Sequence, residues 1–207
     1  MLTLYAATTN HGKLRDFSVA AAESGVAVAP LPGLKEIPAP EENEPTFAGN
    51  ARLKAEYYSR FTDELVLADD SGLEVVALDG QPGVRSARFA EDASFMPQNT
   101  TPALSTDVRN NLYLLDRMRD ALNRTARYHC VLALARNGTV LLRAEGSVEG
   151  EILSAPRGNG GFGYDPLFWL PELGRTMAEI TLEDKHQLSH RGRAFRALLP
   201  QLKTLLP

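Results

Sequence analysis

Two adjacent acids, Asp69 and Asp70, follow the apolar run Leu65–Ala68 and precede Ser71 and Gly72. The apolar run predicts a short buried strand, and the Ser-Gly pair is typical of a turn. Two carboxylates side by side repel each other, and Mg²⁺ relieves that repulsion because it prefers oxygen ligands. The pair is therefore a candidate metal and general-base site, and a solvated acidic turn is the alternative.

A second candidate site lies between the first expected strand, Leu2–Ala7, and the first expected helix, Lys13–Glu23. The turn between them combines a helix N-terminus, a glycine and a lysine. Free N–H groups, the helix dipole and the lysine charge can bind phosphate there. Strand–glycine–helix turns are also common for purely structural reasons. The candidate phosphate-binding residues are Thr8, Thr9, Asn10, His11, Gly12 and Lys13.

The next expected helix, Thr46–Phe61, carries Asn50 and Lys54 on one face. Lys54 is a candidate for neutralising a phosphate, and a solvated surface lysine is the alternative. Glu41 and Glu42 precede this helix, and either carboxylate can join the aspartates as an oxygen ligand. Taken alone, the glutamates fit an exposed acidic loop better.

A glycine-rich segment, residues 158–166, contains Phe162, Tyr164 and Asp165. Aromatic rings stack on nucleic-acid bases, and a carboxylate can accept a hydrogen bond from a base N–H. The density of functional groups makes a ligand-binding loop at least as good an interpretation as a structural turn anchored by aromatic residues.

Residues 185–191 bring together several side chains that can donate hydrogen bonds to a phosphate or a base edge. Arg191 suits bidentate recognition of oxygen atoms. The alternative is that Ser189 caps a last helix reaching Leu199 and that His190 is a first-turn residue with no ligand.

The composition is that of an ordinary globular protein. The 207 residues fit one large domain or one domain with a subdomain, with a sizeable core, and the net charge of −4 gives no sign of a nucleic-acid surface. Cys130 is the only cysteine, so no intrachain disulfide can form, and its apolar surroundings predict a small core residue. No signal pattern or run of membrane-spanning length is visible, so we expect a cytoplasmic protein with no membrane partner.

The remaining pattern predicts an α/β chain with a mixed sheet and flanking helices, because it contains both strand–helix–strand units and a hairpin. The hairpin is expected at Asn137-Gly138, the strongest short hairpin signal. Thr176 and Glu179 have the spacing of a capping box. Further strands are expected over Val26–Leu31, Leu73–Leu78, Tyr128–Ala135, Thr139–Glu145 and Leu167–Leu170.

A further helix is expected over Thr106–Leu122. The polar stretch before it, Glu91–Ser105, predicts a surface excursion. The apolar stripe of the helix is expected to consist of Leu112, Leu115, Met118 and Leu122.

Six motifs occur in a fixed order along nearly the whole chain, and together they resemble the inosine triphosphate pyrophosphatase family, whose members are also called noncanonical purine NTP pyrophosphatases. The motifs are Thr8-x-Asn10-x-Gly12-Lys13, Thr46-Phe47-x-x-Asn50-Ala51-x-x-Lys54-Ala55, Ala68-Asp69-Asp70-Ser71-Gly72-Leu73, Gly80-x-Pro82-Gly83-x-x-Ser86-Ala87-Arg88, Gly160-Gly161-Phe162-Gly163-Tyr164-Asp165-Pro166 and Ser189-His190-Arg191-Gly192.

The resemblance implies a Mg²⁺-dependent hydrolase that converts ITP, dITP or XTP to the monophosphate and pyrophosphate. It implies a single domain over residues 1–207, built as an elongated α/β fold of two lobes around a central cleft and assembled as a homodimer. Thr8–Lys13 and Lys54 would hold the phosphates. Asp70 would be the general base and a metal ligand, and Glu42 a second metal ligand. The remaining substrate contacts would come from Ser71, Phe162, Gly163, Tyr164, Asp165, Lys185, His190 and Arg191.

The chain departs from the family pattern at Gly49, where an acid is usual, and in the region after Arg88. Two other functions compete with the hydrolase. A nucleotide sensor would not need an acidic pair beside lysines. The septum-protein-like pyrophosphatases act on modified pyrimidine nucleotides, but the Phe-Gly-Tyr-Asp and Ser-His-Arg motifs argue against that class.

Overall fold

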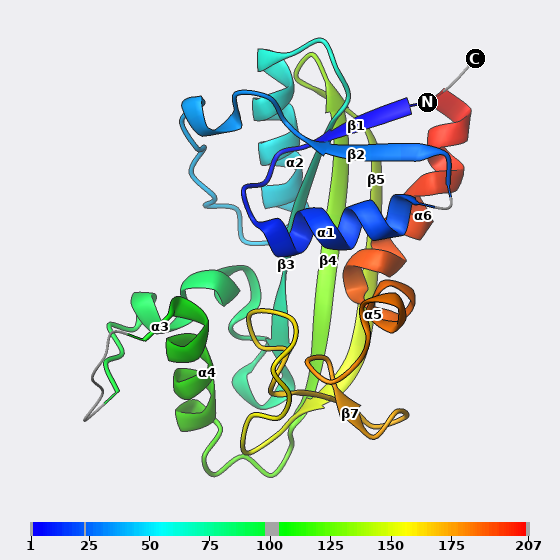
Figure 1. Ribbon diagram of the computed structural model, residues 1–207. Coiled ribbons are helices and arrows are strands. Elements are labelled where there is room, and N and C mark those ends of the chain that lie inside the picture. The colour runs from blue at the N-terminus through cyan, green and yellow to red at the C-terminus, as the bar shows by residue number, and fades with distance from the viewer. Residues whose placement is uncertain (1, 23, 98–103, 206–207) are drawn as a thin grey trace. The chain divides into compact units, whose positions relative to one another are not determined.

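A single mixed β-sheet runs through the structure, a computed structural model that describes residues 2–22, 24–97 and 104–205 (Figure 1). Its seven strands have the order β2-β1-β3-β4-β5-β6-β7. β1 is parallel to β2 and β3, whereas β6 is antiparallel to β5 and β7. The predicted α/β class with a mixed sheet is confirmed. The strands are β1 (Leu2–Ala6), β2 (Val26–Pro30), β3 (Val66–Val75), β4 (Thr125–Arg136), β5 (Thr139–Ile152), β6 (Phe168–Leu170) and β7 (Arg175–Thr176).

Six α-helices occur among the described residues. They are α1 (His11–Ala21), α2 (Phe47–Tyr58), α3 (Phe89–Asp92), α4 (Thr106–Arg117), α5 (Leu182–Leu188) and α6 (His190–Leu205), with short 3₁₀ turns at Leu34–Glu36, Ser59–Phe61, Val76–Leu78 and Gly83–Arg88. No helix of the described ranges is long and apolar enough to cross a membrane.

The chain divides into two compact units. The first contains Met1–Ser71, His129–Ser147 and Glu183–Pro207, and the second contains Gly72–Tyr128 and Val148–Leu182. The single functional domain and the central cleft that the family resemblance implies stay predictions.

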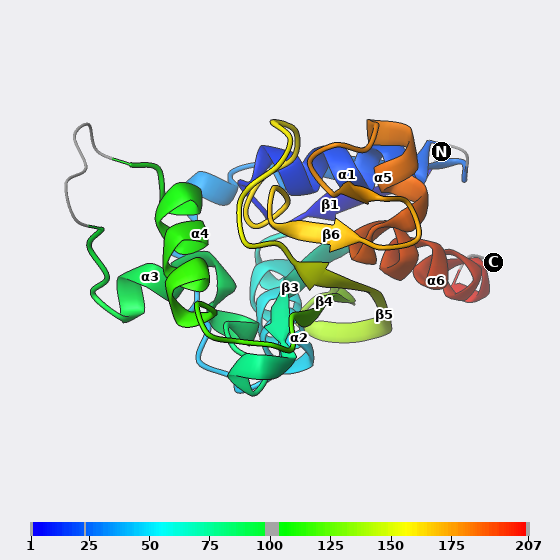
Figure 2. The same cartoon turned by 90° about the horizontal axis from the view of Figure 1, so that it is seen from below.

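The first unit has apolar contacts on both faces of its strands. On one face, Phe17 of α1 and Phe195 of α6 pack with Leu67 of β3. On the other face, Val66 of β3 packs with Tyr58 of α2. Figure 2 accordingly shows β1 and β3 between α1 and α2. Neighbouring residues of β3 thus reach different helices, because side chains alternate along a strand.

The second unit has its own core, in which Leu114 and Met118 of α4 pack with Phe168 of β6. α3 lies against α4 (Figures 1 and 2). Arg124 donates hydrogen bonds to the carbonyl oxygens of Met118, Ile152 and Leu153, and so fixes the chain just after α4.

The largest correction concerns the acidic turn. Asp69, Asp70 and Gly72 lie inside the continuous strand β3 and not in a turn after Ala68. Both acids are buried, and each forms an ion pair with a lysine. These pairs offset the cost of burying charge, so the strand continues through the acids to Val75.

The helix predictions need smaller corrections. α4 ends at Arg117, so Leu122 lies beyond it and is fully exposed. Leu112 is exposed as well, whereas Met118 is buried as predicted and Leu115 is partly buried against the same core. Leu114, which was not predicted, is the other fully buried residue of the stripe. Of the expected polar excursion, Glu91 and Asp92 belong to α3, and residues 98–103 lie outside the described part of the chain.

Helix ends at both termini also differ from the sequence predictions. α1 begins at His11, two residues earlier than expected, and α6 continues to Leu205. α5 was not predicted, although Glu183 and Asp184 in its first turn are a helix-start signal. Glu179 does accept from the Thr176 N–H as in a capping box, but no helix follows it directly.

Two local predictions are confirmed. Asn137 and Gly138 both have positive φ, 50° and 76°, and connect β4 to β5 as a tight hairpin turn requires. Cys130 is a fully buried core residue of the first unit.

Candidate functional site

Strand β3 directs Asp69 and Asp70 to different helices of the first unit. Asp69 meets Lys13 of α1, whereas Asp70 meets Lys54 of α2. The alternation continues at Ser71, which contacts Arg191 of α6. Side chains alternate between the two faces of a strand. This alternation places Val66 and Leu67 on opposite faces of β3, and it places the two acids on opposite faces as well.

Both oxygens of Asp70 have a partner from α2. Lys54 Nζ lies 2.9 Å from Asp70 Oδ1, and Asn50 Nδ2 donates to Asp70 Oδ2 at 3.2 Å. Lys54 and Asn50 are one helical turn apart and are both buried, as is Asp70. The carboxylate is thus held in one orientation by a charged and a neutral donor.

Asn50 also fastens the acidic loop before α2. Its Oδ1 accepts from the Glu44 N–H at 3.1 Å, and its Nδ2 donates to the Glu44 carbonyl at 3.3 Å. The Glu44 side chain packs over Gly49, where an added Cβ would lie 2.7 Å from Glu44 Cβ. Gly49 therefore leaves room for the loop to close onto the first turn of α2.

Glu42 belongs to the same loop and reaches Lys54. Its Oε2 lies 2.6 Å from Lys54 Nζ, so two carboxylates share one ammonium group. Burial lowers the pKa of Lys54, but the charges of Asp70, Asp69 and Glu42 outweigh burial and raise it to about 12. Burial raises the pKa of Asp70 above its ordinary value, against the charge of Lys54.

Asp69 anchors a network on the opposite face of β3. Lys13 Nζ lies 2.8 Å from Asp69 Oδ2, and the Ser71 hydroxyl donates to the same oxygen at 3.0 Å. Arg191 donates to Ser71 Oγ at 3.0 Å and pairs with Asp16 of α1 at 3.4 Å. Burial raises the pKa of Asp69, but Lys13 and Arg191 outweigh burial and hold it at about 2.

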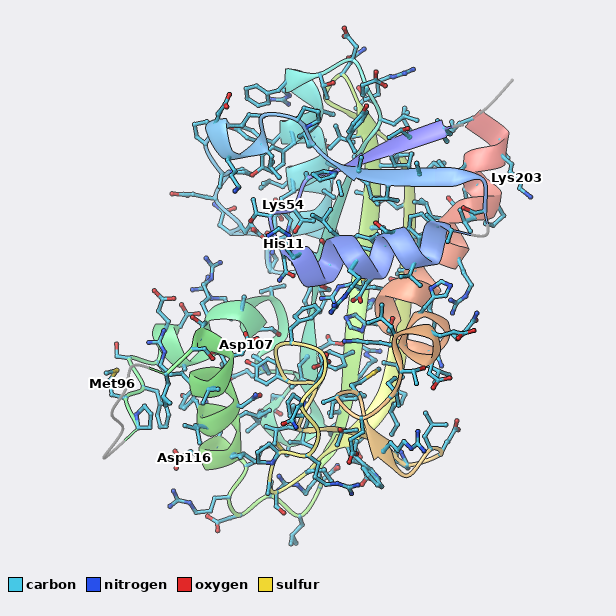
Figure 3. The ribbon with its side chains drawn as sticks, viewed as in Figure 1. His11, Lys54, Met96, Asp107, Asp116 and Lys203 are labelled. Carbon is cyan, nitrogen blue, oxygen red and sulfur yellow. The ribbon has the colours of Figure 1, made fainter. Side chains whose placement is uncertain are left out.

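Asn10, in the turn before α1, caps the N-terminus of that helix. Asn10 Oδ1 accepts from the N–H groups of Gly12 and Lys13 at 2.8 and 3.1 Å, and Thr8 Oγ1 accepts from the Asn10 N–H. Two of the helix N–H groups expected to bind phosphate are therefore engaged by the cap. His11 is exposed at the first position of α1; Figure 3 labels it together with Lys54.

The short junction between α5 and α6 buries Lys185, His190 and Arg191. The hydroxyl of Ser189 accepts from the Gly192 N–H at 3.1 Å, which confirms Ser189 as the predicted cap of the last helix. Burial, reinforced by Arg191 and Lys185, lowers the pKa of His190 well below its ordinary value. His190 is therefore neutral at pH 7.

The glycine-rich loop belongs to the second unit. The Tyr164 ring is buried in that unit's core, and its hydroxyl donates to the Ser86 carbonyl at 2.8 Å. Asp165 accepts from the Phe162 N–H at 2.9 Å and from the Tyr128 hydroxyl at 3.3 Å. Tyr164 and Asp165 thus have structural partners, and Phe162, which is half-buried, has the ring best suited to meet a ligand.

The structure therefore brings the candidates together in two separate groups. One group, in the first unit, contains Lys13, Glu42, Lys54, Asp69, Asp70, Ser71 and Arg191 around β3, together with Thr8–Gly12 before and at the start of α1 and with Lys185 and His190 of α5 and α6. The other, in the second unit, contains Phe162, Gly163, Tyr164 and Asp165. The substrate contacts of both groups stay predictions.

The sequence prediction gave no site role to Asp16 and named Asp69 only as a member of the acidic pair, although both join the network of charges. Asp16 lies three residues after Lys13, a spacing that places both on one face of α1, and this signal was available. Asp69 was treated only as a partner of Asp70, because the strand was expected to end at Ala68.

The donor set around Lys54 fits a hard divalent cation. Carboxylate oxygens of Glu42 and Asp70 converge on a position that already carries positive charge. Among the described residues, no group of three or more His, Cys, Asp or Glu is arranged to hold a metal ion. Two carboxylates, completed by water and substrate phosphate, are a usual environment for Mg²⁺.

The family model and the relatives that match this chain all indicate the same protein family. The sequence model of the Ham1 family matches residues 4–201. A dITP/XTP pyrophosphatase of Acidobacterium capsulatum is 63% identical over 202 residues, covering 97% of this chain and 98% of the relative. One from Thermus thermophilus is 48% identical, covering 95% of this chain and 90% of the relative.

Solved structures agree with these relatives. A HAM1 protein from Coxiella burnetii is 35% identical with a TM-score of 0.81, covering 99% of this chain and 100% of that structure. The Ham1 protein of Staphylococcus aureus is also 35% identical, with a TM-score of 0.80 and the same coverage.

Proposed function

This chain belongs to the Ham1 family, and we propose that it hydrolyses noncanonical purine nucleoside triphosphates, among them dITP, XTP and ITP, to the monophosphate and pyrophosphate. The family resemblance read from the six sequence motifs is confirmed. The observation that carries the chemical assignment is the buried Asp70 carboxylate, oriented by Lys54 and Asn50 beside a second carboxylate.

Asp70 is the proposed general base. A water oxygen attacks phosphorus, the α–β phosphoanhydride bond breaks, and Asp70 accepts the proton that the water loses. A carboxylate whose pKa is raised by burial is a stronger base than an ordinary aspartate, which favours this transfer near neutral pH. The departing pyrophosphate keeps the electron pair of the broken bond.

Lys54 and Lys13 are the proposed electrostatic stabilisers of the leaving pyrophosphate. Lys54 stays protonated over the whole physiological range because its pKa is about 12. Asp69 holds Lys13 and Ser71 holds Arg191, so the charges of both side chains are positioned before substrate binds. Preorganised charge of this kind needs no rearrangement when negative charge develops.

Glu42 and Asp70 are the proposed ligands of a Mg²⁺ ion, because their oxygens converge near Lys54. When bound, such an ion neutralises phosphate charge and lowers the pKa of a bound water. Asn50 keeps both ligands in place, since it binds Asp70 directly and Glu42's loop through Glu44.

Phe162 and His190 are the proposed determinants of base recognition. The Phe162 ring would stack on the purine. A neutral imidazole can donate one hydrogen bond to the 6-oxo group of hypoxanthine or xanthine, and adenine would leave that donor facing an amine. Substrate contacts from Ser71, Gly163, Tyr164, Asp165 and Lys185 rest on the family resemblance, as do a homodimer and a cytoplasmic location.

A substrate panel tests the proposed function. Purified protein is incubated with Mg²⁺ and each nucleotide, and pyrophosphate and orthophosphate are measured separately. The proposal expects pyrophosphate from dITP, XTP and ITP, with ATP turned over far more slowly. Orthophosphate as the only product would contradict cleavage between the α and β phosphates.

The same panel separates the two competing classes. A nucleotide sensor would bind ITP without releasing pyrophosphate. A pyrimidine-directed pyrophosphatase would prefer 5-methyl-UTP to ITP. Either result would overturn the proposed substrate class.

A further inference from the structure

One face of α4 binds both backbone polar groups of Gly163, a residue of the glycine-rich loop. Asp107 Oδ2 accepts from the Gly163 N–H at 2.8 Å, and Asn111 Nδ2 donates to the Gly163 carbonyl at 3.0 Å. The two side chains are four residues apart, which places them one above the other on the helix. Figure 3 labels Asp107 at the start of α4.

Gly163 is a residue whose backbone conformation these hydrogen bonds restrain. Gly163 has φ of 62°, and no atom lies within 4 Å of where its Cβ would be. The glycine is therefore required by backbone conformation and not by close packing. Glycine loses more conformational freedom on ordering than other residues, so external hydrogen bonds are needed to keep one conformation.

Gly163 lies directly between two residues with different tasks. Tyr164 is fixed in the core, and its hydroxyl donates to the Ser86 carbonyl. Phe162 is half-buried and is the proposed stacking ring. The direction in which Phe162 leaves the core therefore depends on the two peptide groups of Gly163, one bound by Asp107 and the other by Asn111.

Hydrogen bonds to residues 86–90 hold α4, the helix that binds Gly163, in place. Asn110 is buried, donates to the carbonyls of Ser86 and Ala87, and accepts from the Ala90 N–H. The Ser86 carbonyl thus accepts from both Asn110 and Tyr164. Asp107 sits in the first turn of α4, where the helix dipole stabilises a carboxylate.

We propose that Asp107 and Asn111 are positioning residues for base recognition, acting through Gly163 on the orientation of Phe162. This inference rests on the proposed function, and neither residue takes part in the proton transfer or phosphate binding assigned above. Their loss is expected to weaken binding of the nucleoside part of the substrate and to leave the phosphate part unaffected.

The test compares Asp107→Ala, Asn111→Ala and the double variant with the parent protein. Loss of one such hydrogen bond is expected to raise KM for dITP by about threefold to tenfold, and kcat should change by less than about twofold. Asp116→Ala is the matched control, because Asp116 lies on the same helix and pairs with the exposed Arg119. Its KM should equal that of the parent.

Inhibition by pyrophosphate distinguishes a positioning role from general damage to the fold. Pyrophosphate has no base, so a change in base recognition alone should not alter its binding. Its inhibition constant is expected to stay within twofold of the parent in all variants, while the dissociation constant of dIMP rises with the KM for dITP. Asp107→Asn keeps an accepting oxygen and is expected to restore much of the loss.

Two results would overturn the proposal. One is a folded double variant whose KM for dITP and Kd for dIMP stay within twofold of the parent. The other is an equal weakening of dITP, dIMP and pyrophosphate, which would indicate general damage to the fold. If the double variant does not fold, the single variants and Asp107→Asn give the same comparison.

Failure of the proposed function is distinguishable from failure of this inference. If the parent protein released no pyrophosphate from any purine nucleotide, the proposed function would be wrong, and dIMP binding would still test the loop. A parent that hydrolyses dITP, with variants indistinguishable from it, would contradict the positioning role alone.

Discussion

Asp69 and Asp70 are consecutive in the chain, yet each binds its own lysine, 2.8 Å away on α1 and 2.9 Å away on α2. The environment also separates their acidities. The pKa of Asp69 is held at about 2 by neighbouring cations, whereas burial raises the pKa of Asp70. Two neighbouring carboxylates whose pKa values move in opposite directions indicate one anchoring group and one proton acceptor.

The anchoring role of Asp69 predicts that Asp69→Asn lowers stability more than it lowers turnover. Removing one partner of a buried ion pair costs several kcal/mol, and the partial exposure of Lys13 reduces this to about 1–3 kcal/mol. Urea denaturation measures the loss. We expect kcat for dITP to fall less than in Asp70→Asn, and an equal or larger fall would assign the base to Asp69.

Asn50 is predicted to be essential for the geometry of Asp70. Asn50→Ala removes the donor to Asp70 and the two hydrogen bonds to the partly buried Glu44 backbone, at a cost of about 1–3 kcal/mol in stability. We expect kcat to fall by about tenfold or more. Arg52→Ala, on an exposed part of the same helix, is the control and should keep parent activity. A fully active Asn50→Ala enzyme would refute the positioning role.

His190 is predicted to make stability depend on pH in the acidic range. Its folded pKa is lowered by burial and by the facing charges of Arg191, Lys185, Lys13 and His129. The unfolded chain therefore binds a proton below about pH 6.5 that the folded chain does not, and stability falls as pH falls.

Between pH 7.5 and 5.5 this group contributes a loss of at most about 1.4 kcal/mol, the limit set by the unfolded pKa of about 6.5. The free energy of unfolding of the parent and of His190→Gln, measured at both pH values, isolates the contribution. The variant should lose less stability than the parent on acidification. Identical losses would mean that His190 titrates normally in the folded protein.

Phe162 is predicted to provide stacking energy to the base. Phe162→Ala should weaken binding of ITP by about 1–3 kcal/mol, measured as a dissociation constant with catalytically inactive protein. Phe162→Tyr keeps an aromatic face and is the matched control. An unchanged dissociation constant in Phe162→Ala would exclude stacking by this ring.

The sequence predicted most elements because their signals are local. The Asn137-Gly138 turn and the Ser189 cap depend on residues adjacent in the chain, and both are confirmed. Leu122 was assigned to a buried stripe by periodicity, but α4 stops where Met118 enters the core. Periodicity alone does not show where a helix ends.

The site was harder to predict than the fold, for a physical reason. The lysine partners of Asp69 and Asp70 come from α1 and α2 and not from the residues next to them in sequence, and the lysine charges offset the cost of burying the two acids. Without them, an acidic pair before Ser71 and Gly72 reads as a turn. The role of Asp107 depends in the same way on a contact with Gly163, which no local pattern reveals.

The central claim is that Asp70 accepts the proton of the attacking water, and the most direct test is single-turnover release of pyrophosphate from dITP by Asp70→Asn. The amide keeps the size of the side chain but is not a base, so the rate should fall by about 10²–10⁴ while dITP still binds. A rate within threefold of the parent, about 0.6 kcal/mol in activation free energy, would contradict the assignment.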